Sequence, residues 1–421
     1  MTTKPVWIWL PGQTDPVKAG SFDRTTGHQV PVGAFSYDQD YLAMDQRMQL
    51  DQGQLSKFRG TVRTTDYGGL FGILRDVKPE GFGLDTLHRK YEVSSLDDLD
   101  ALELSAGDSV GALEVCEDID SKKAYRPHSA ETMFDVMQAL SPAESNAHVV
   151  TEMEGLQGTS LGGERPKITV LHEGQQWIAK FAGSRDDPMS TLREYLAMKL
   201  ARLCQIDAAP VQYVNKNGRG TILVKRFDRD IDQNGRLTRS HFASAATVLG
   251  ANASKAGDKG RTYPNLAIQA LRWGVVGHKP ELWRRIAFNV LVGNGDDHPR
   301  NHGFLRGLDG WRLSPAYDIA PYSPNGGKAV DVKALSMGIL PNGNAGADAR
   351  TLLLASKLFD LSYEDANSYL ETTFAAIHDQ WDTLAREVGQ NPLQKPLFEL
   401  PALAERPSPE EVAKYRYSAH R

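Results

Sequence analysis

The chain has 421 residues, which at roughly 150 residues per domain predicts two or three compact units with an ample core. Hydrophobic residues make up 40% and charged residues 24%, a composition that excludes disordered, collagen-like and low-complexity proteins. The formal net charge of −5 argues against binding to nucleic acid or an anionic membrane through overall charge, although a local basic patch is compatible with it.

The N-terminal apolar stretch is too short for a signal peptide, and no apolar run reaches the ~20 residues that a membrane span needs. Two cysteines, Cys116 and Cys204, are too few for a disulfide framework. We therefore expect a cytoplasmic protein whose thiols are reduced and which has no membrane partner.

The first 120 residues are predicted to form short elements joined by many turns. Residues 6–10 (VWIWL) are apolar enough for a strand, and residues 68–91 favour helix with glycine interruptions. Residues 105–115 (SAGDSVGALEV) indicate a turn that leads into a strand. The polar and basic residues 121–130 are typical of a domain boundary.

Residues 157–228 predict a small sheet with one helix, in the order β-β-α-β-β. Residues 165–183 contain two strand-like runs around a Glu-Gly turn, which favours a hairpin. Apolar residues recur at helical spacing over residues 191–206. Two more strands are predicted over residues 209–227, around an Asn-Gly-Arg-Gly turn.

The chain after residue 235 is predicted to be mostly helical. Residues 280–296 begin with a proline suited to a first helical turn and carry apolar side chains on one face. Residues 362–389 give the clearest helix, with Ser362 as candidate N-cap. Apolar residues follow at a mean spacing near 3.6: Ala366, Leu370, Phe374, Ile377, Trp381, Leu384 and Val388. The polar tail after Pro407 is expected to be loosely held.

A glycine-rich segment precedes the first strand of the predicted small sheet. In residues 158–167 (GTSLGGERPK) the glycines would let backbone N–H groups approach a phosphate, and Lys167 would add positive charge. A surface turn is the alternative, because short glycine motifs are common. The segment is not a Walker A motif, since no Gly-Lys-Ser or Gly-Lys-Thr follows it.

Lys180 lies in the middle of a predicted strand between apolar neighbours. A half-buried lysine needs an acidic partner or an anionic ligand, and Glu194 on the following helix could pair with it. A strand lysine and a helix glutamate position the nucleotide phosphates in kinases. The alternatives are a solvated lysine and an exposed helix glutamate.

Residues 294–304 (NGDDHPRNHGF) form a polar loop after a predicted helix. Asp296 and Asn301 are five residues apart, the spacing of the base and the metal-binding asparagine in a kinase catalytic loop. An aspartate there can accept a hydroxyl proton, and the asparagine can give a carbonyl oxygen to Mg²⁺. An Asx-rich turn is the alternative. A zinc site fits poorly, because His298 and His302 have no nearby cysteine and no further histidine at a suitable spacing.

Asp318 closes the strand-like residues 311–322 (WRLSPAYDIAPY), 22 positions after Asp296. Kinases hold their main Mg²⁺ ligand beyond the catalytic loop at such a place, whereas Asp318 taken alone would be read as a turn residue. The four features occur in one order along the chain. Together they favour ATP-dependent phosphoryl transfer.

At these residues the sequence resembles the HipA family of serine/threonine kinases, the toxins of bacterial toxin–antitoxin pairs. SLGGERPK resembles the family's phosphate loop, VKRFDR (224–229) its lobe-joining segment, and GDSVGALEV (107–115) the end of its N-terminal domain. FNVLVGNGDDHPRNHGFL and LSPAYDIAPY resemble its catalytic and metal loops. The resemblance implies an α+β, two-lobed protein-kinase-like fold. Its expected parts are an N-terminal α/β subdomain over residues 1–125, a β-rich lobe over 126–234 and a helical lobe over 235–421.

The resemblance also implies a role for each matching residue. Asp296 would be the base, His298 would support the catalytic loop, and Asn301 and Asp318 would hold Mg²⁺. ATP would contact these residues and further ones: Lys180 at the phosphates, Gly162, Gly163, Glu164, Arg165, Pro166 and Lys167 along the triphosphate, Lys225, Arg226 and Phe227 at the adenine end, and Tyr317 beside Asp318. Ser160 matches a serine that becomes autophosphorylated, and a phosphate of about −1.5 to −2 charges there would repel the ATP phosphates.

The partners implied by the resemblance are a helix-turn-helix, HipB-like antitoxin that binds operator DNA, and a protein substrate in translation, typically an aminoacyl-tRNA synthetase. Two other functions stay open. A small-molecule phosphotransferase of the aminoglycoside or choline kinase type shares the Asp-x-His-x-x-Asn pattern at residues 296–301. A catalytically silent corepressor scaffold is the third reading, against which the intact set of candidate catalytic residues argues.

Overall fold

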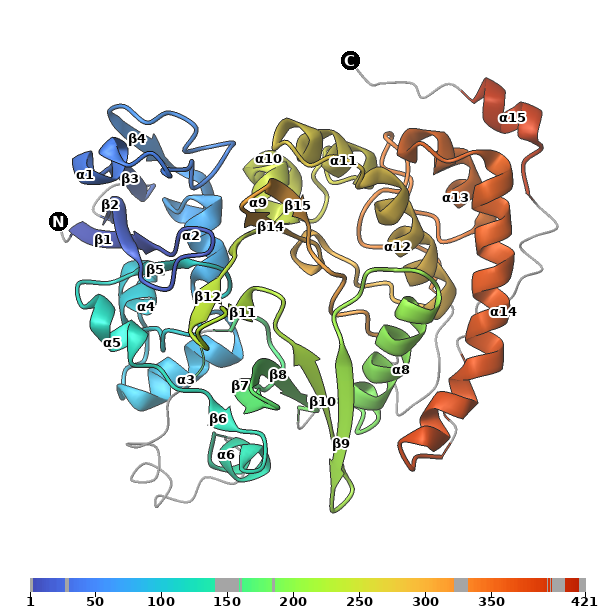
Figure 1. The fold of residues 1–421 in the computed structure, drawn as a ribbon. Helices are drawn as coiled ribbons and strands as arrows, with labels where there is room; N and C mark the ends of the chain where they lie inside the picture. The colour runs from blue at the N-terminus through green and yellow to red at the C-terminus, as the bar shows by residue number, and fades with distance from the viewer. Residues whose placement is uncertain are drawn as a thin grey trace. The chain divides into compact units, whose positions relative to one another are not determined.

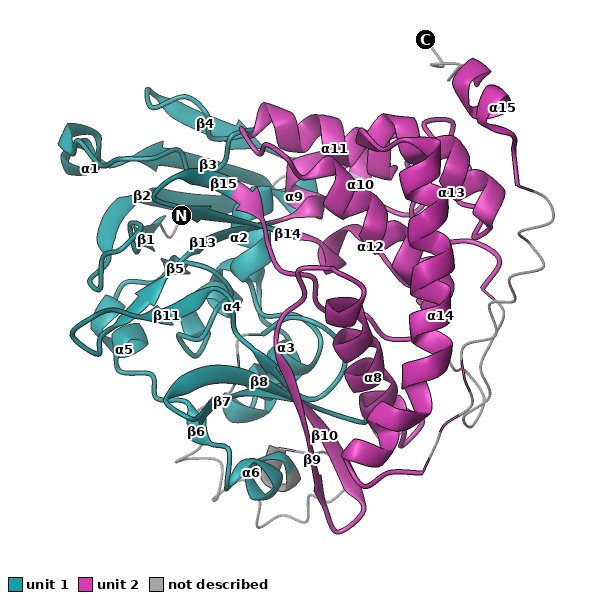
Figure 2. Cartoon of the chain, turned by 45° about the vertical axis from the view of Figure 1, so that its right-hand side comes forward, with its two compact units in different colours: residues 1–184, 223–243, 304–311 teal, residues 185–222, 244–303, 312–421 magenta. Residues whose placement is uncertain are grey.

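The computed structural model describes residues 3–26, 30–140, 159, 161–183, 186–321, 332–391, 393, 395 and 406–415. Figure 1 labels the helices and strands, and Figure 2 colours two compact units. Unit 1 takes residues 1–184, 223–243 and 304–311, and unit 2 takes residues 185–222, 244–303 and 312–421. Each unit therefore draws on three separate stretches of the chain, and the three-part division expected from the sequence stays a prediction.

Unit 1 begins with a five-stranded antiparallel sheet in the order β4-β3-β2-β1-β5. Its strands are β1 (Thr3–Ile8), β2 (Val17–Thr25), β3 (Val32–Tyr37), β4 (Thr61–Thr64) and β5 (Leu113–Val115). Alternate residues face the core, so that Val6 and Ile8 of β1 are buried, as are Phe22 and Phe35, which pair across β2 and β3. The strand predicted at residues 6–10 is present as β1, but it starts earlier and ends at Ile8.

Short helices accompany this sheet: α1 (Gln39–Ala43), α2 (Gly72–Val77), α3 (Phe82–Lys90), α4 (Asp98–Leu104) and α5 (Ile119–Lys123). The helical stretch predicted at residues 68–91 is two helices, because the chain breaks around Pro79 and Gly81. Proline has no N–H to donate, and Gly81 adopts a positive φ of 51°.

Residues 121–130 contribute to the packing of unit 1. Lys122 is only 3% exposed, and its ammonium donates hydrogen bonds to the carbonyl oxygens of Leu102, Glu103 and Ser105 at the end of α4. Burial lowers the pKa of Lys122, while nearby acidic groups, Glu114 first among them, oppose that shift. A lysine at a helix C-terminus satisfies carbonyl groups that have no partner within the helix.

A second five-stranded sheet has the order β6-β7-β8-β10-β9. Its strands are β6 (His128–Ser129), β7 (Lys167–His172), β8 (Gln175–Phe181), β9 (Val211–Lys216) and β10 (Arg219–Lys225). The predicted β7–β8 hairpin is confirmed, and Glu173 and Gly174 at its turn have φ of 50° and 72°. Asn217 and Gly218 between β9 and β10 have φ of 55° and 81°, and left-handed residue pairs of this kind match the twist of hairpin strands.

Unit 2 contains most of the longer helices, including those predicted after residue 235. Its helices are α8 (Ser190–Leu203), α9 (Ala245–Leu249), α10 (Ala251–Ser254), α11 (Tyr263–Arg272), α12 (Lys279–Val292), α13 (Ala349–Ala355), α14 (Tyr363–Glu387) and α15 (Pro409–Lys414). The long helix α14 packs on α8 and α12, as Figures 1 and 2 show. There the Tyr369 hydroxyl donates to the carbonyl of Cys204 at 3.1 Å, and its ring meets Trp283 edge-on.

Helix α14 begins as the sequence predicts, with the Ser362 hydroxyl accepting the backbone N–H of Asp365 at 3.0 Å. Its buried face contains Ala366, Leu370, Thr373, Ile377, Trp381, Leu384 and Ala385. The predicted apolar face is therefore largely right, but Thr373 takes the inward position expected for Phe374. Phe374 and Val388 are only partly buried.

Smaller elements complete the fold. Strands β11 (Arg229–Ile231) and β12 (Leu237–Arg239) pair with each other, and β13 (His241–Ser244), β14 (Gly303–Gly307) and β15 (Gly310–Leu313) form a three-stranded sheet. The expectation of a loosely held tail is wrong for the residues of α15. Ser408 and Glu411 form a reciprocal capping box there, and Val412 is 2% exposed.

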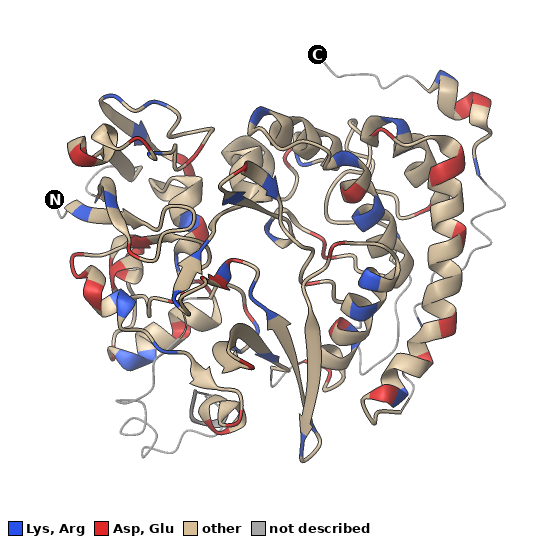
Figure 3. Cartoon of the chain, in the orientation of Figure 1, with Lys and Arg blue, Asp and Glu red and all other residues tan. Residues whose placement is uncertain are grey.

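Within the described residues, no helix is both long enough and apolar enough to cross a membrane. Cys116 and Cys204 are buried free thiols, and burial raises their pKa values to about 12 and about 11. Figure 3 shows acidic and basic residues on elements of both units, with acidic residues recurring along α14.

Candidate active site

The candidate catalytic loop of unit 2 follows α12, which ends at Val292 before Gly293 in a left-handed conformation. The carbonyl oxygen of Asp296 accepts the backbone N–H of His298 at 2.8 Å and the side-chain N–H of Asn301 at 3.1 Å. Asn301 is 9% exposed, whereas the side chain of Asp296 is exposed. The loop therefore folds back on itself and brings Asp296, His298 and Asn301 together while Asp296 stays accessible.

The buried carboxylate of Asp297 fixes the position of this loop through hydrogen bonds. Its carboxylate is 2% exposed and accepts the Tyr263 hydroxyl at 2.5 Å, and it also hydrogen-bonds His302 Nε2 at 2.9 Å. Burial alone would raise the pKa of the Asp297 carboxyl. The charge of His302, together with hydrogen bonds from His302, Tyr263 and Asn289, outweighs the effect of burial, so the pKa is lowered. The carbonyl of His302 in turn accepts the N–H of Ala245 at the start of α9.

The candidate metal segment is tied to the catalytic loop within unit 2. The Tyr317 hydroxyl donates to the carbonyl oxygen of Arg300 at 2.8 Å. On the other side, Ala316 exchanges backbone hydrogen bonds with Asp207 (2.7 Å) and Ala209 (2.9 Å). These bonds hold Ala316 and Tyr317, the two residues that precede Asp318.

Asp318 itself has an unusual backbone. The strand expected to close on this residue ends earlier, at Leu313, and Asp318 adopts a φ of 58° in the left-handed region. A non-glycine residue held there costs on the order of 1 kcal/mol or more, and such strain is concentrated at functional sites. This conformation sets the direction in which the Asp318 side chain leaves the backbone.

Asn301 and Asp318 suit a magnesium ion by the chemistry of their donors. Because the Asn301 N–H group is used by the Asp296 carbonyl, the amide oxygen is the atom that remains for a cation. Amide and carboxylate oxygens are the ligands that hard cations such as Mg²⁺ prefer. In the described part of the chain, no group of three or more His, Cys, Asp or Glu side chains is placed to hold a metal.

The other predicted residues lie in unit 1, around the start of β7. Lys167 and Lys180 are direct partners in the β7–β8 register. The ammonium of Lys167 donates to the carbonyl oxygen of Gly162 at 2.9 Å, and Gly163 between them needs its positive φ of 105°. Lys180 is 9% exposed. The exposed residues Gly162, Gly163 and Glu164 and the paired Lys167 and Lys180 thus belong to one region of unit 1.

Of the lobe-joining residues, Lys225 ends β10, and Arg226 and Phe227 follow it. The backbone N–H of Arg226 donates to the carbonyl of Gln176 on β8. The Arg226 guanidinium is buried and donates to both carboxylate oxygens of Asp228, at 3.0 and 2.8 Å. Since this side chain is held in a buried ion pair, a nucleotide contact by Arg226 would use its backbone.

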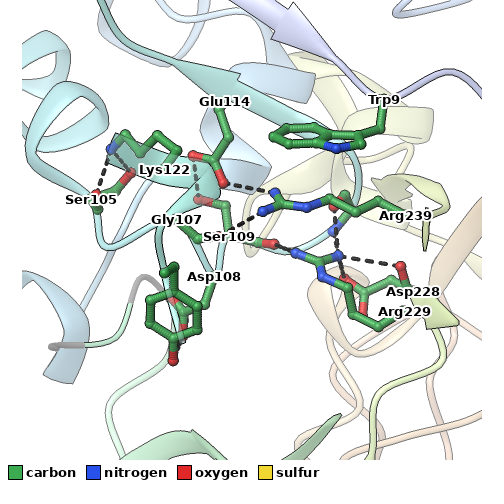
Figure 4. A network of polar contacts seen from close by, with 12 residues as sticks. Trp9, Ser105, Gly107, Asp108, Ser109, Glu114, Lys122, Asp228, Arg229 and Arg239 are labelled. Carbon is green, nitrogen blue, oxygen red and sulfur yellow. Dashed lines mark hydrogen bonds and ion pairs between the residues drawn. The ribbon is translucent and has the colours of Figure 1, made fainter. Parts of the chain in front are cut away.

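Asp228 also belongs to a buried network of charges with Arg229, Arg239 and Glu114, which Figure 4 labels. Asp228 also accepts Arg229 at 2.8 Å and the N–H of Gly111 at 2.7 Å. Burial would raise the pKa of Asp228, yet the charges of Arg226 and Arg229 hold it well below its usual range. This network fixes the lobe-joining segment to residues 108–111 of the N-terminal part.

The network continues to β12 and β5. Arg239 donates to Glu114 at 2.9 Å and to the carbonyl of Gly107 at 2.8 Å, and its guanidinium carbon lies 3.8 Å from the ring centroid of Trp9. The sequence indicates no role for Glu114 or Arg239, nor for Tyr263 and Asp297 in anchoring the catalytic loop. The strings GDSVGALEV and VKRFDR marked this region in the sequence, without indicating which of their side chains pair.

Two predictions have no structural test. Ser160 lies outside the described residues, so its expected phosphorylation stays a prediction. Lys180 is part of unit 1 and Glu194 is part of unit 2, and their pairing also stays a prediction.

Comparisons with known proteins extend over nearly the whole chain. Residues 10–116 match the HipA N-terminal domain, and residues 159–381, more than half of the chain, match the HipA-like C-terminal domain. A solved structure of the Shewanella oneidensis toxin–antitoxin complex of HipA, HipB and operator DNA has a similar chain, with a TM-score of 0.59 at 18% identity. The match covers 96% of this chain and 94% of that one, and at this identity it shows the α+β fold.

Curated relatives match at modest identity. A putative kinase, Y4mE, from Sinorhizobium fredii is 28% identical over 54% of this chain and 58% of its own length. The serine/threonine-protein kinase toxin HipA of Shewanella oneidensis is 24% identical over 59% of this chain and 62% of its own. Toxin YjjJ of Escherichia coli is 27% identical over 62% of each. The matched region thus spans about three fifths of the length of these relatives.

Proposed function

Because this chain belongs to the HipA family, we propose that it is an ATP-dependent serine/threonine protein kinase that acts as the toxin of a toxin–antitoxin pair. The observation that carries the proposal is the loop of unit 2, where a buried Asp297 anchors a loop that leaves Asp296 accessible and fixes the Asn301 amide. Phosphoryl transfer depends on such positioning rather than on covalent chemistry by the protein.

In this proposal each residue performs a task that its environment permits. Asp296 accepts the proton of the substrate hydroxyl and directs its oxygen at the γ-phosphate. His298 and the bond from Asn301 hold the loop, and the oxygens of Asn301 and Asp318 hold Mg²⁺. When bound, this ion neutralises negative charge on the phosphates. Tyr317 keeps the segment of Asp318 beside the catalytic loop through Arg300.

The nucleotide phosphates are assigned to unit 1. Lys180 and Lys167 would contribute positive charge, and the backbone from Gly162 to Pro166, including Glu164 and Arg165, would lie along the triphosphate. The adenine end would meet the backbone of Lys225 to Phe227. The support for this assignment is the exposed glycine backbone next to the paired lysines of β7 and β8.

The further assignments rest on the family and its relatives. The Shewanella HipA structure includes HipB and operator DNA, so we propose a HipB-like antitoxin and, through it, DNA for this chain. We also propose autophosphorylation at Ser160 and a translation protein, such as an aminoacyl-tRNA synthetase, as substrate. A substrate in translation would place the activity in the cytoplasm.

The test uses the full chain with labelled ATP, Mg²⁺ and either a cell lysate or a set of small metabolites. We expect label on protein serine or threonine, no label after Mg²⁺ is chelated, and no label with Asp296→Ala or Asp318→Ala. Label confined to small metabolites would support the small-molecule phosphotransferase instead. Absence of any transfer by a folded protein that binds a HipB-like partner would support the silent scaffold.

Ser160→Ala separates self-modification from activity toward other proteins. We expect this variant to phosphorylate its external target while losing its own label and its self-limitation. Mass spectrometry after incubation with Mg²⁺ and ATP would locate the phosphate. A phosphate on another residue, with none on Ser160, would contradict this assignment.

A further inference from the structure

The glycine-rich segment before β7 rests on the start of helix α3. The backbone N–H of Phe82, the first residue of α3, donates to the carbonyl oxygen of Gly163 at 3.1 Å. Phe82 belongs to the part that matches the HipA N-terminal domain, and Gly163 to the part that matches the C-terminal domain. Both lie in unit 1, so this contact joins the two family domains within one compact body.

The segments around residues 81–83 and 159–163 approach each other so closely that side chains would not fit between them. A Cβ atom at Gly83 would stand 2.8 Å from the carbonyl oxygen of Leu161 and 3.1 Å from that of Thr159. A Cβ atom at Gly81 would stand 2.5 Å from the carbonyl oxygen of Gly163. Carbon and oxygen do not pack at such distances, so both glycines are required for the contact.

Asp108 also holds the glycine-rich segment, through hydrogen bonds to a threonine on each side of it. Its carboxylate oxygen Oδ2 accepts the Thr159 hydroxyl at 3.1 Å and the Thr169 hydroxyl of β7 at 2.9 Å. The Thr159 oxygen in turn accepts the backbone N–H of Leu161 at 3.1 Å. Asp108 and Thr159 are each 1% exposed, and a buried hydrogen bond to a carboxylate is among the stronger ones in proteins.

We propose that Gly81, Phe82, Gly83 and Asp108, which we call the loop seat, position the ATP phosphate loop for nucleotide binding. The inference rests on the proposed function, because it takes residues 161–167 as that loop. A loop held in its binding conformation loses less conformational freedom when the ligand arrives, so the seat raises nucleotide affinity. By linkage, a partner that displaces the start of α3 changes nucleotide affinity, and nucleotide changes affinity for that partner by the same factor.

The test compares two variants that disturb the contact between the loop seat and the segment it holds, called the seat variants, with matched controls in the full chain. Gly83→Ala places a methyl group against the loop, and Thr159→Val removes the hydroxyl that joins Asp108 to Leu161. Gly307→Ala is the control for the first, since a Cβ atom there meets nothing within 4 Å. Thr159→Ser keeps the hydroxyl and is the control for the second.

We expect each seat variant to raise the Kd of Mg-ATP, measured by calorimetry, and the KM for ATP about tenfold, while kcat changes less than threefold. Both controls should bind ATP like the parent protein. Hydrogen exchange without nucleotide should be at least tenfold faster at the Leu161 amide in the seat variants, with the exchange of α14 unchanged. The α14 readout shows that the variants are folded.

Folded seat variants with parental Kd and parental exchange at Leu161 would overturn the inference. The exchange measurement also separates it from the proposed function. A parent protein that binds no Mg-ATP would refute the proposed function and the role in nucleotide binding, whereas faster exchange in the variants would still show that the seat holds the segment.

Discussion

Asp296 and Asp297 are neighbours in the sequence, yet we expect removal of Asp297 to lower the stability of the fold and removal of Asp296 to abolish activity without changing stability. Asp297→Ala deletes a buried carboxylate that pairs with Tyr263 and His302, which are themselves 0% and 2% exposed. Taking one partner from a buried, charged network costs about 3–5 kcal/mol of unfolding free energy, because the remaining polar groups lose their partners away from water. Asp296→Ala removes an exposed side chain, and such changes usually stay within about 0.5 kcal/mol.

Urea denaturation followed by tryptophan fluorescence measures the first effect, and transfer of labelled phosphate measures the second. Asp296→Ala should be as stable as the parent protein and inactive, while Asp297→Ala should unfold at clearly lower urea. Asp297→Asn keeps one acceptor oxygen and should fall between the parent protein and Asp297→Ala. Equal unfolding midpoints for the two alanine variants, or near-normal turnover by Asp296→Ala, would refute the reasoning.

The pH dependence supplies a further check on Asp297. Its pKa is lowered in the folded protein, so the stability it contributes is fully present above the unfolded value of about 3.9 and is lost as the pH falls through the folded value. The difference in stability between the parent protein and Asp297→Asn should therefore shrink below about pH 4. A difference that grew as the pH fell in that range would contradict the sign of the shift.

Two further variants test buried acids of unit 1. Asp228→Asn leaves Arg226 and Arg229 with one buried negative charge fewer, and it should cost about 3–5 kcal/mol in urea unfolding. Asp309→Asn, in the exposed turn between β14 and β15, should have little effect. Asp51→Asn should stabilise the protein above pH 6 by up to about 3 kcal/mol, because burial raises the pKa of Asp51 to about 6. The contribution of Asp51 to parental stability should correspondingly fall as the pH rises from about 4 to 6, so the gain from Asp51→Asn should grow over that range. A variant less stable than the parent protein at pH 8 would contradict this.

Elements whose signal is local could be predicted from the sequence. The β7–β8 hairpin follows from its Glu-Gly turn, and the core face of α14 follows from helical spacing, apart from the turn where Thr373 replaces Phe374. The sequence does not predict strands β2 to β4 in this way, because β3 and β4 pair residues about 30 positions apart. The register of such strands is set by which of their faces is buried in the fold, and a local pattern does not show this.

The candidate site divides in the same way. The spacing of Asp296 and Asn301 is visible in the sequence, and the structure shows the bond that joins them. The tasks of Asp297 and Asp108 are not visible, because each depends on partners from distant elements: Tyr263 for Asp297, and Thr159 and Thr169 for Asp108. An aspartate in a polar string gives no indication of whether it is buried.

The ion pair between Glu114 and Arg239 spans 125 positions of the chain, and it has a consequence for synthesis of the protein. At about 5–20 residues per second, a ribosome adds the arginine roughly 6–25 s after the glutamate. During that interval the nascent N-terminal part carries an acidic side chain that the native fold neutralises only later. A chaperone that recognises incomplete domains would bind the nascent chain while Glu114 has no Arg239 to pair with. A truncated chain that ends before β12 would never form this ion pair.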